Sequence, residues 1–129
     1  MPPAILLIDD DPDFLAIHRE VLEQAGFAVT TARDGQEGQA CLARQKPDLI
    51  VLDVMMTTIT EGLDLARRLK NHPDWRDIPI LLLTGMTKTP QFPREFAGIT
   101  DQDWAAAAML DKPVRPATLV REVKRLLGL

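Results

Sequence analysis

Short apolar runs alternate along the chain with longer stretches in which apolar residues recur at helical spacing. The runs are apolar throughout, a pattern typical of strands that are covered on both faces of a parallel sheet. They predict five strands, the second and fifth of them less strongly patterned, at residues 4–8, 27–32, 49–52, 80–83 and 106–110. The strands therefore need helices above and below the sheet.

The intervening stretches supply those helices. Apolar stripes at helical spacing predict helices over residues 12–25, 34–45 and 61–70, and a last one that begins at Pro116. Asp11 is interpreted as the N-cap of the first helix, because Pro12 suits a first-turn position. Residues 86–100 contain two prolines and a glycine, which indicates a long loop with at most one helical turn. The alternating order predicts a doubly wound α/β fold.

Polar side chains follow the predicted strands where each strand ends. In open α/β sheets, ligands bind beyond the carboxyl ends of the strands, so these residues are candidates for a site. They comprise carboxylates, one hydroxyl and one ammonium group: Asp9, Asp10 and Asp11 after the first strand, Asp53 after the third, Thr84 after the fourth, and Asp111 and Lys112 after the fifth. If the strands are parallel, all of these groups converge on one edge of the sheet.

The chemistry of this set indicates a divalent cation next to a phosphoryl group. Neighbouring carboxylates repel one another, and Mg²⁺, which prefers oxygen ligands, relieves that repulsion. A hydroxyl and an ammonium group both donate to phosphate oxygens. One carboxylate can itself accept the phosphoryl group, since aspartate forms an acyl phosphate.

Composition narrows the range of functions. The 129 residues are enough for one domain, so we expect a single domain over residues 1–129 with no output domain. A net charge of −4 argues against direct binding to nucleic acid or to a membrane surface. One cysteine, Cys41, and a start without a basic region before its apolar run favour a cytoplasmic protein.

Four motifs together resemble the receiver domain of two-component response regulators, the CheY-like superfamily. In chain order they are Leu6-Leu7-Ile8-Asp9-Asp10-Asp11, Asp48-Leu49-Ile50-Val51-Leu52-Asp53-Val54-Met55-Met56, Leu83-Thr84-Gly85 and Asp111-Lys112-Pro113. Each motif alone is weak, but all four at strand ends and in this order are specific. The resemblance implies a flavodoxin-like (βα)5 three-layer sandwich with a parallel sheet of order 2-1-3-4-5.

The resemblance also implies a Mg²⁺ site. By matching positions, Asp10 and Asp53 would bind the cation directly, and Asp9 would act largely through water. The main-chain carbonyl of Met55 would be a further ligand.

The same matching implies a phosphoacceptor. Asp53 would take the phosphoryl group from a sensor histidine kinase or a phosphotransfer protein. Thr84 would hydrogen-bond a phosphoryl oxygen, and Lys112 would pair with it. No enzymatic activity is expected beyond the domain's own Mg²⁺-dependent phosphotransfer and dephosphorylation. A downstream effector would bind around residues 86–112, and the oligomeric state is left open.

One position departs from the family and keeps a second hypothesis open. Relatives usually carry Tyr or Phe three residues before the lysine, whereas this chain has Met109 and no tyrosine at all. The aromatic switch of the family therefore cannot operate in its usual form, although a flexible methionine can repack and leaves a switch through this surface open. The alternative is a receiver-like interaction module that signals by binding, without phosphorylation.

Overall fold

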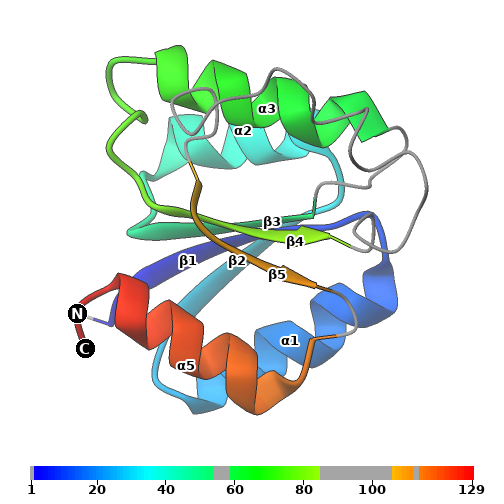
Figure 1. Ribbon diagram of the computed structural model, residues 1–129, viewed down its shortest axis with the longest axis vertical. Coiled ribbons are helices and arrows are strands. Elements are labelled where there is room, and N and C mark those ends of the chain that lie inside the picture. Colours follow the sequence, from blue (N-terminus) through cyan, green and yellow to red (C-terminus); the bar gives the residue numbers. More distant parts are fainter. Residues whose placement is uncertain (1, 54–58, 85–105, 112–113) are drawn as a thin grey trace.

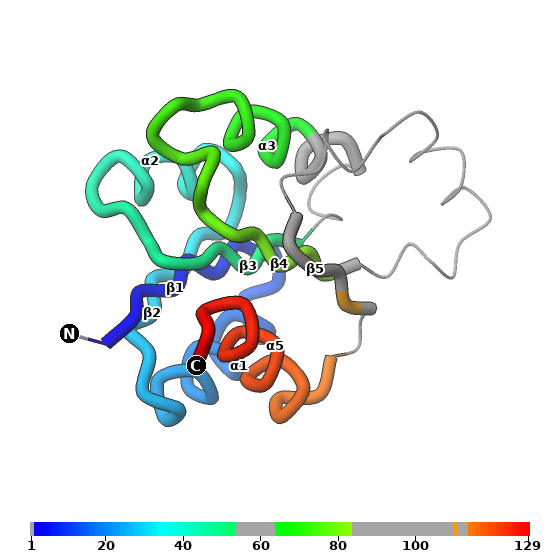
Figure 2. Tube along the Cα trace, turned by 60° about the vertical axis from the view of Figure 1, so that its left-hand side comes forward, coloured from blue at the N-terminus to red at the C-terminus, as the bar shows by residue number. Residues whose placement is uncertain are grey.

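The computed structural model describes residues 2–53, 59–84, 106–111 and 114–129. Within these residues, five strands form one parallel sheet of order β2-β1-β3-β4-β5. In Figure 2, β1, β3 and β4 follow one another across the middle of the molecule. The strands are β1 (Ala4–Ile8), β2 (Ala28–Ala32), β3 (Leu49–Asp53), β4 (Ile80–Thr84) and β5 (Ala106–Asp111). The predicted fold class and strand order are confirmed.

Four helices of the described chain cover the sheet on both faces. They are α1 (Pro12–Gln24), α2 (Gly35–Arg44), α3 (Ile59–Asn71) and α5 (Pro116–Leu126). Helices α1 and α5 lie on one face of the sheet, and α2 and α3 lie on the other (Figure 1). None of the helices in the described part of the chain is both long enough and apolar enough to cross a membrane. The predicted loop over residues 86–100 lies outside the described residues.

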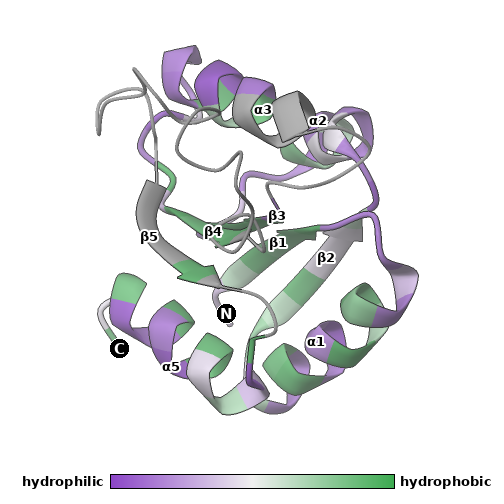
Figure 3. Cartoon of the chain, turned by 45° about the vertical axis from the view of Figure 1, so that its right-hand side comes forward, coloured by the Kyte–Doolittle hydropathy of each residue, from purple (hydrophilic) through white to green (hydrophobic). Residues whose placement is uncertain are grey.

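The core consists of two layers, one on each face of the sheet. Successive strand residues point to opposite faces, so Leu6 and Ile8 of β1 pack toward α2 and α3, while Ile5 and Leu7 pack toward α1 and α5. Strands β1 and β3 are apolar along nearly their whole length, whereas α1 and α5 each combine hydrophobic and hydrophilic residues (Figure 3). This burial on both faces explains why the strand sequences do not alternate.

Helix α2 approaches β1 closely at Gly38. A Cβ atom built on Gly38 would lie 2.7 Å from Cδ1 of Ile8, a side chain that is itself fully buried. The absence of a side chain at position 38 therefore sets the distance between the helix and the strand. Ile8 directly precedes Asp9, so this contact lies next to the candidate site.

His18 is a buried polar residue in the apolar face of α1. Its ring is stacked on Phe14 with centroids 3.9 Å apart, and Nδ1 donates to the Phe14 carbonyl at 2.9 Å. Nε2 is buried, and no hydrogen-bond partner for it is found among the described residues. His18 is thus packed against the core, and its Nε2 has no hydrogen-bond partner within the described part of the chain.

Replacing His18 by leucine should stabilise the domain. The change removes a buried, unsatisfied nitrogen, and the Phe14 carbonyl keeps its helical hydrogen bond. We expect the free energy of unfolding, measured in urea, to rise by about 1 kcal/mol. Ala16→Leu, at an exposed position of the same helix, is the control and should change stability by less than about 0.5 kcal/mol. A fall in stability for His18→Leu would contradict this account.

Candidate functional site

The pairing of the two central strands brings Asp9 and Asp53 to the same edge of the sheet. Ile8 of β1 is paired with Leu52 of β3, Asp9 is the residue after Ile8, and Asp53 is the last residue of β3. Both acids therefore lie at carboxyl ends of adjacent parallel strands. This is the position at which ligands bind in open α/β sheets.

Three carboxylates gather there. One oxygen from each of Asp9, Asp10 and Asp53 lies within 4.8 Å of the others. Asp9 and Asp53 are 0% and 2% exposed, whereas Asp10 is exposed to solvent. Two buried acids and one exposed acid at this separation suit a hard divalent cation that enters from solvent, because oxygen ligands and negative charge are both supplied. The donor set thus fits Mg²⁺.

Hydrogen bonds from the main chain hold Asp9 in place. Its own amide donates to the carbonyl of Ala32 at 3.1 Å, which extends the pairing of β1 with β2. Its Oδ1 accepts from the amide of Asp11 at 2.9 Å, two residues further along. Both the main chain and the carboxylate of this buried acid are therefore oriented by neighbouring peptide groups.

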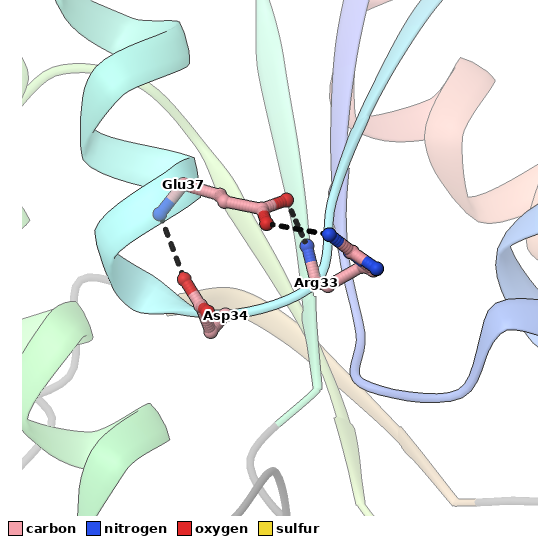
Figure 4. Close-up of polar contacts among 3 residues, drawn as sticks. All are labelled: Arg33, Asp34 and Glu37. Atoms are coloured by element: carbon pink, nitrogen blue, oxygen red, sulfur yellow. Dashed lines mark hydrogen bonds and ion pairs between the residues drawn. The ribbon is translucent and has the colours of Figure 1, made fainter.

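The turn that follows β2 is ordered by a small polar cluster (Figure 4). Asp34 caps α2 by accepting from the amide of Glu37 at 2.8 Å. Glu37 in turn accepts from the amide of Arg33 at 3.1 Å and pairs with the Arg33 guanidinium at 3.3 Å. This reciprocal arrangement resembles a capping box shifted by one residue, and it fixes the entry into α2.

The other predicted site residues are described only in part. Thr84 is the last residue of β4, one position beyond the Leu83 that pairs with Asp53, so its main chain lies at the same edge. It is paired with Asp111, the last residue of β5. Lys112 and Met55 lie outside the described residues. Most of the surface predicted for an effector, around residues 86–112, also lies outside them.

One polar contact of the site was not anticipated from the sequence. The structure confirms the predicted role of Asp11 as the N-cap of α1, and the Asp11 amide also donates to the carboxylate of Asp9. The sequence pattern that indicates this contact is an acidic residue, any residue, a second acidic residue and then a proline, here residues 9–12. Aspartate readily accepts from the amide two residues later, and proline holds the residue before it in an extended conformation.

Comparison with known proteins identifies relatives of the whole chain. Residues 5–124 match the family model described as the response regulator receiver domain. The DNA-binding dual master transcriptional regulator RpaA of Synechocystis is 35% identical over 125 residues, which is 97% of this chain and 49% of that protein. The chain thus spans about half the length, or less, of the curated relatives that it matches.

Solved structures agree with the fold. The receiver domain of a signal transduction histidine kinase from Syntrophus aciditrophicus superposes with a TM-score of 0.83 at 32% identity, covering 98% of this chain and 90% of that one. The receiver domain of a Pseudomonas aeruginosa sensor histidine kinase gives 0.82 at 26% identity, with both chains covered completely. That second structure has a magnesium ion coordinated in its active-site cleft.

Proposed function

The chain belongs to the response regulator receiver domain family of two-component systems, and from this premise we propose that Asp53 is its phosphoacceptor, acting with Mg²⁺. The observation that carries the proposal is the gathering of three carboxylates, with Asp53 buried at the end of a central strand. Asp53 is the last residue of β3, is 2% exposed, and lies within reach of the same cation as Asp9 and Asp10. These features favour phosphorylation over an interaction module that works by binding alone.

The three acids have different tasks in this proposal. Asp10 and Asp53 would bind Mg²⁺ directly with the main-chain carbonyl of Met55, and Asp9 would act largely through water. Mg²⁺, when bound, supplies positive charge that offsets the carboxylates and the phosphoryl oxygens. Asp9 is fully buried, and the Asp11 amide holds its carboxylate in place beside Asp10 and Asp53.

The transfer itself exchanges one bond to phosphorus for another. An oxygen of Asp53 attacks the phosphorus of a phosphohistidine on the donor protein. The bond from the histidine nitrogen to phosphorus breaks as the new oxygen–phosphorus bond forms. Thr84 would donate its hydroxyl to a phosphoryl oxygen, and the Lys112 ammonium would pair with another. These groups position the phosphoryl group and neutralise its charge.

We propose a sensor histidine kinase or a phosphotransfer protein as the donor. The exposed side of the carboxylate cluster, at Asp10, is where such a donor can approach. The surface around residues 86–112 is proposed to contact the downstream effector. Water would later hydrolyse the acyl phosphate and return the domain to its resting state.

Phosphorylation can be tested without knowing the donor. The purified chain is incubated with acetyl phosphate and Mg²⁺, and its intact mass is measured over time. We expect a gain equal to one phosphoryl group, and no gain when a chelator is present from the start of the reaction. No gain in mass in the presence of both reagents would contradict the proposal.

A further inference from the structure

Asp11 contacts the proposed metal site through its main chain. Its side chain is exposed, and its Oδ1 accepts from the amides of Asp13 at 2.9 Å and Phe14 at 3.4 Å, which caps α1. Its carbonyl accepts the first hydrogen bond of the helix, from the amide of Leu15 at 3.1 Å. The carboxylate of Asp11 is thus engaged with the helix end, while its amide donates to Asp9.

The backbone conformation of Asp11 connects its hydrogen bonds to the first turn of α1 with its hydrogen bond to Asp9. Its φ and ψ angles are −91° and 109°, the extended conformation expected of an N-cap. Pro12, at the first helical position, also disfavours any helical conformation at Asp11. The cap and the proline together fix the peptide plane whose N–H group points at Oδ1 of Asp9.

The orientation of Asp9 matters because this residue is buried. With 0% exposure, its carboxylate has no bulk water to stabilise alternative rotamers. Hydrogen bonds to the groups around a metal typically control the affinity of the metal site. Because the Asp11 amide holds one oxygen of the Asp9 carboxylate, this carboxylate is already oriented relative to Asp10 and Asp53, the other members of the cluster.

We propose that Asp11 is a positioning residue of the metal site: by capping α1, it fixes the amide that orients the Asp9 carboxylate within the three-acid cluster. The cap of the helix and the affinity for the cation are then coupled. The Mg²⁺ part of this inference rests on the function proposed above, whereas the hydrogen bond between the Asp11 amide and Asp9 does not.

Two substitutions of Asp11 distinguish the effect of capping α1 from the effect of the carboxylate charge. Asp11→Ala removes both, whereas Asp11→Asn removes the charge and keeps a side chain that caps equally well. We expect Asp11→Ala to weaken Mg²⁺ binding about tenfold and Asp11→Asn to stay close to wild type. Binding is measured by titrating MgCl₂ while following the amide resonances of residues 9 and 10. Equal weakening in both variants would assign the effect to charge and overturn the proposal.

A matched control removes a cap elsewhere. Asp34→Ala deletes the cap of α2, whose side chain bonds Glu37 and is not part of the carboxylate cluster. It should lower the melting temperature much as Asp11→Ala does, yet leave the Mg²⁺ affinity unchanged. Equal affinities in Asp11→Ala and the wild type would show that Asp11 only stabilises the helix, and would overturn the proposal.

A measurement without Mg²⁺ keeps this inference distinct from the proposed function. Hydrogen exchange of the residue 11 amide reports its bond to Asp9 directly. We expect the amide to be protected in the wild type and in Asp11→Asn, and to exchange about tenfold faster in Asp11→Ala. Rapid exchange in the wild type would overturn the inference even if Asp53 is phosphorylated. Protection lost only in the alanine variant would support it even if phosphorylation fails.

Discussion

Asp53→Asn should abolish phosphorylation by acetyl phosphate completely, because the amide that replaces the carboxylate is a poor nucleophile and lacks its charge. The same variant should lose most of the stabilisation that Mg²⁺ gives the wild type. A cation at a hundred times its dissociation constant stabilises the native state by about 2.7 kcal/mol. Asparagine leaves only two of the three carboxylates of the cluster, so this gain should fall to a small fraction. Intact mass and thermal unfolding with and without Mg²⁺ measure the two effects.

Asp48→Asn is the matched control for this substitution. Asp48 immediately precedes β3, and its Oδ2 accepts from the amide of Ala4 at 2.7 Å, at the opposite edge of the sheet from Asp53. The change should weaken that hydrogen bond and lower the stability slightly, with phosphorylation and the Mg²⁺ effect retained. Undiminished phosphorylation of Asp53→Asn would place the acceptor at another residue, with Asp10 the next candidate.

Gly38→Leu should strongly destabilise the domain. A Cβ atom at this position already comes within 2.7 Å of Ile8, and the side chain of Leu65 is the next neighbour, at 3.9 Å. Because Ile8 and Leu65 are buried, they have little room to move, and α2 must shift away from the sheet. We expect a loss of about 3 kcal/mol in the free energy of unfolding, measured in urea.

Ala40→Leu places the same side chain at an exposed position of the same helix. It should change the free energy of unfolding by less than about 0.5 kcal/mol. Gly38→Ala is informative as well, since the gain in helix propensity, about 1 kcal/mol, opposes the clash with one terminal methyl group. Wild-type stability of Gly38→Leu would show that α2 does not depend on this close contact.

The strands could be predicted from the sequence because their burial is uniform. Residues 4–8 form β1 with the bounds expected, since an apolar run covered on both faces has sharp ends. Strand β5 was harder to predict, because alanine has little preference for strands. Pairing with β4, through Ile80 and Ala106, nevertheless makes residues 106–111 a strand. Helix α3 begins at Ile59, two residues before its predicted start at residue 61, a normal uncertainty for a helix end.

The candidate site could be predicted as far as it follows from topology. Parallel strands place Asp9 and Asp53 at one edge, whatever the details of packing. Contacts that depend on the exact approach of two elements could not be predicted. The contact of Gly38 with Ile8 and the bond from the Asp11 amide to Asp9 are of this kind. The local amino-acid sequence does not indicate which residue of a strand a helix will contact.

The central place of β1 in the sheet has a consequence for the order of events in folding. Strand β1 pairs with β2 on one side, but on its other side Ile5 is paired with Leu49, far along the chain. During synthesis, one edge of β1 therefore stays open until β3 has emerged, and an open apolar edge invites association with other chains. Asp9 and Asp53 come together only when β3 pairs with β1. The cluster of Asp9, Asp10 and Asp53 therefore forms only after β3 has been synthesised and has paired with β1.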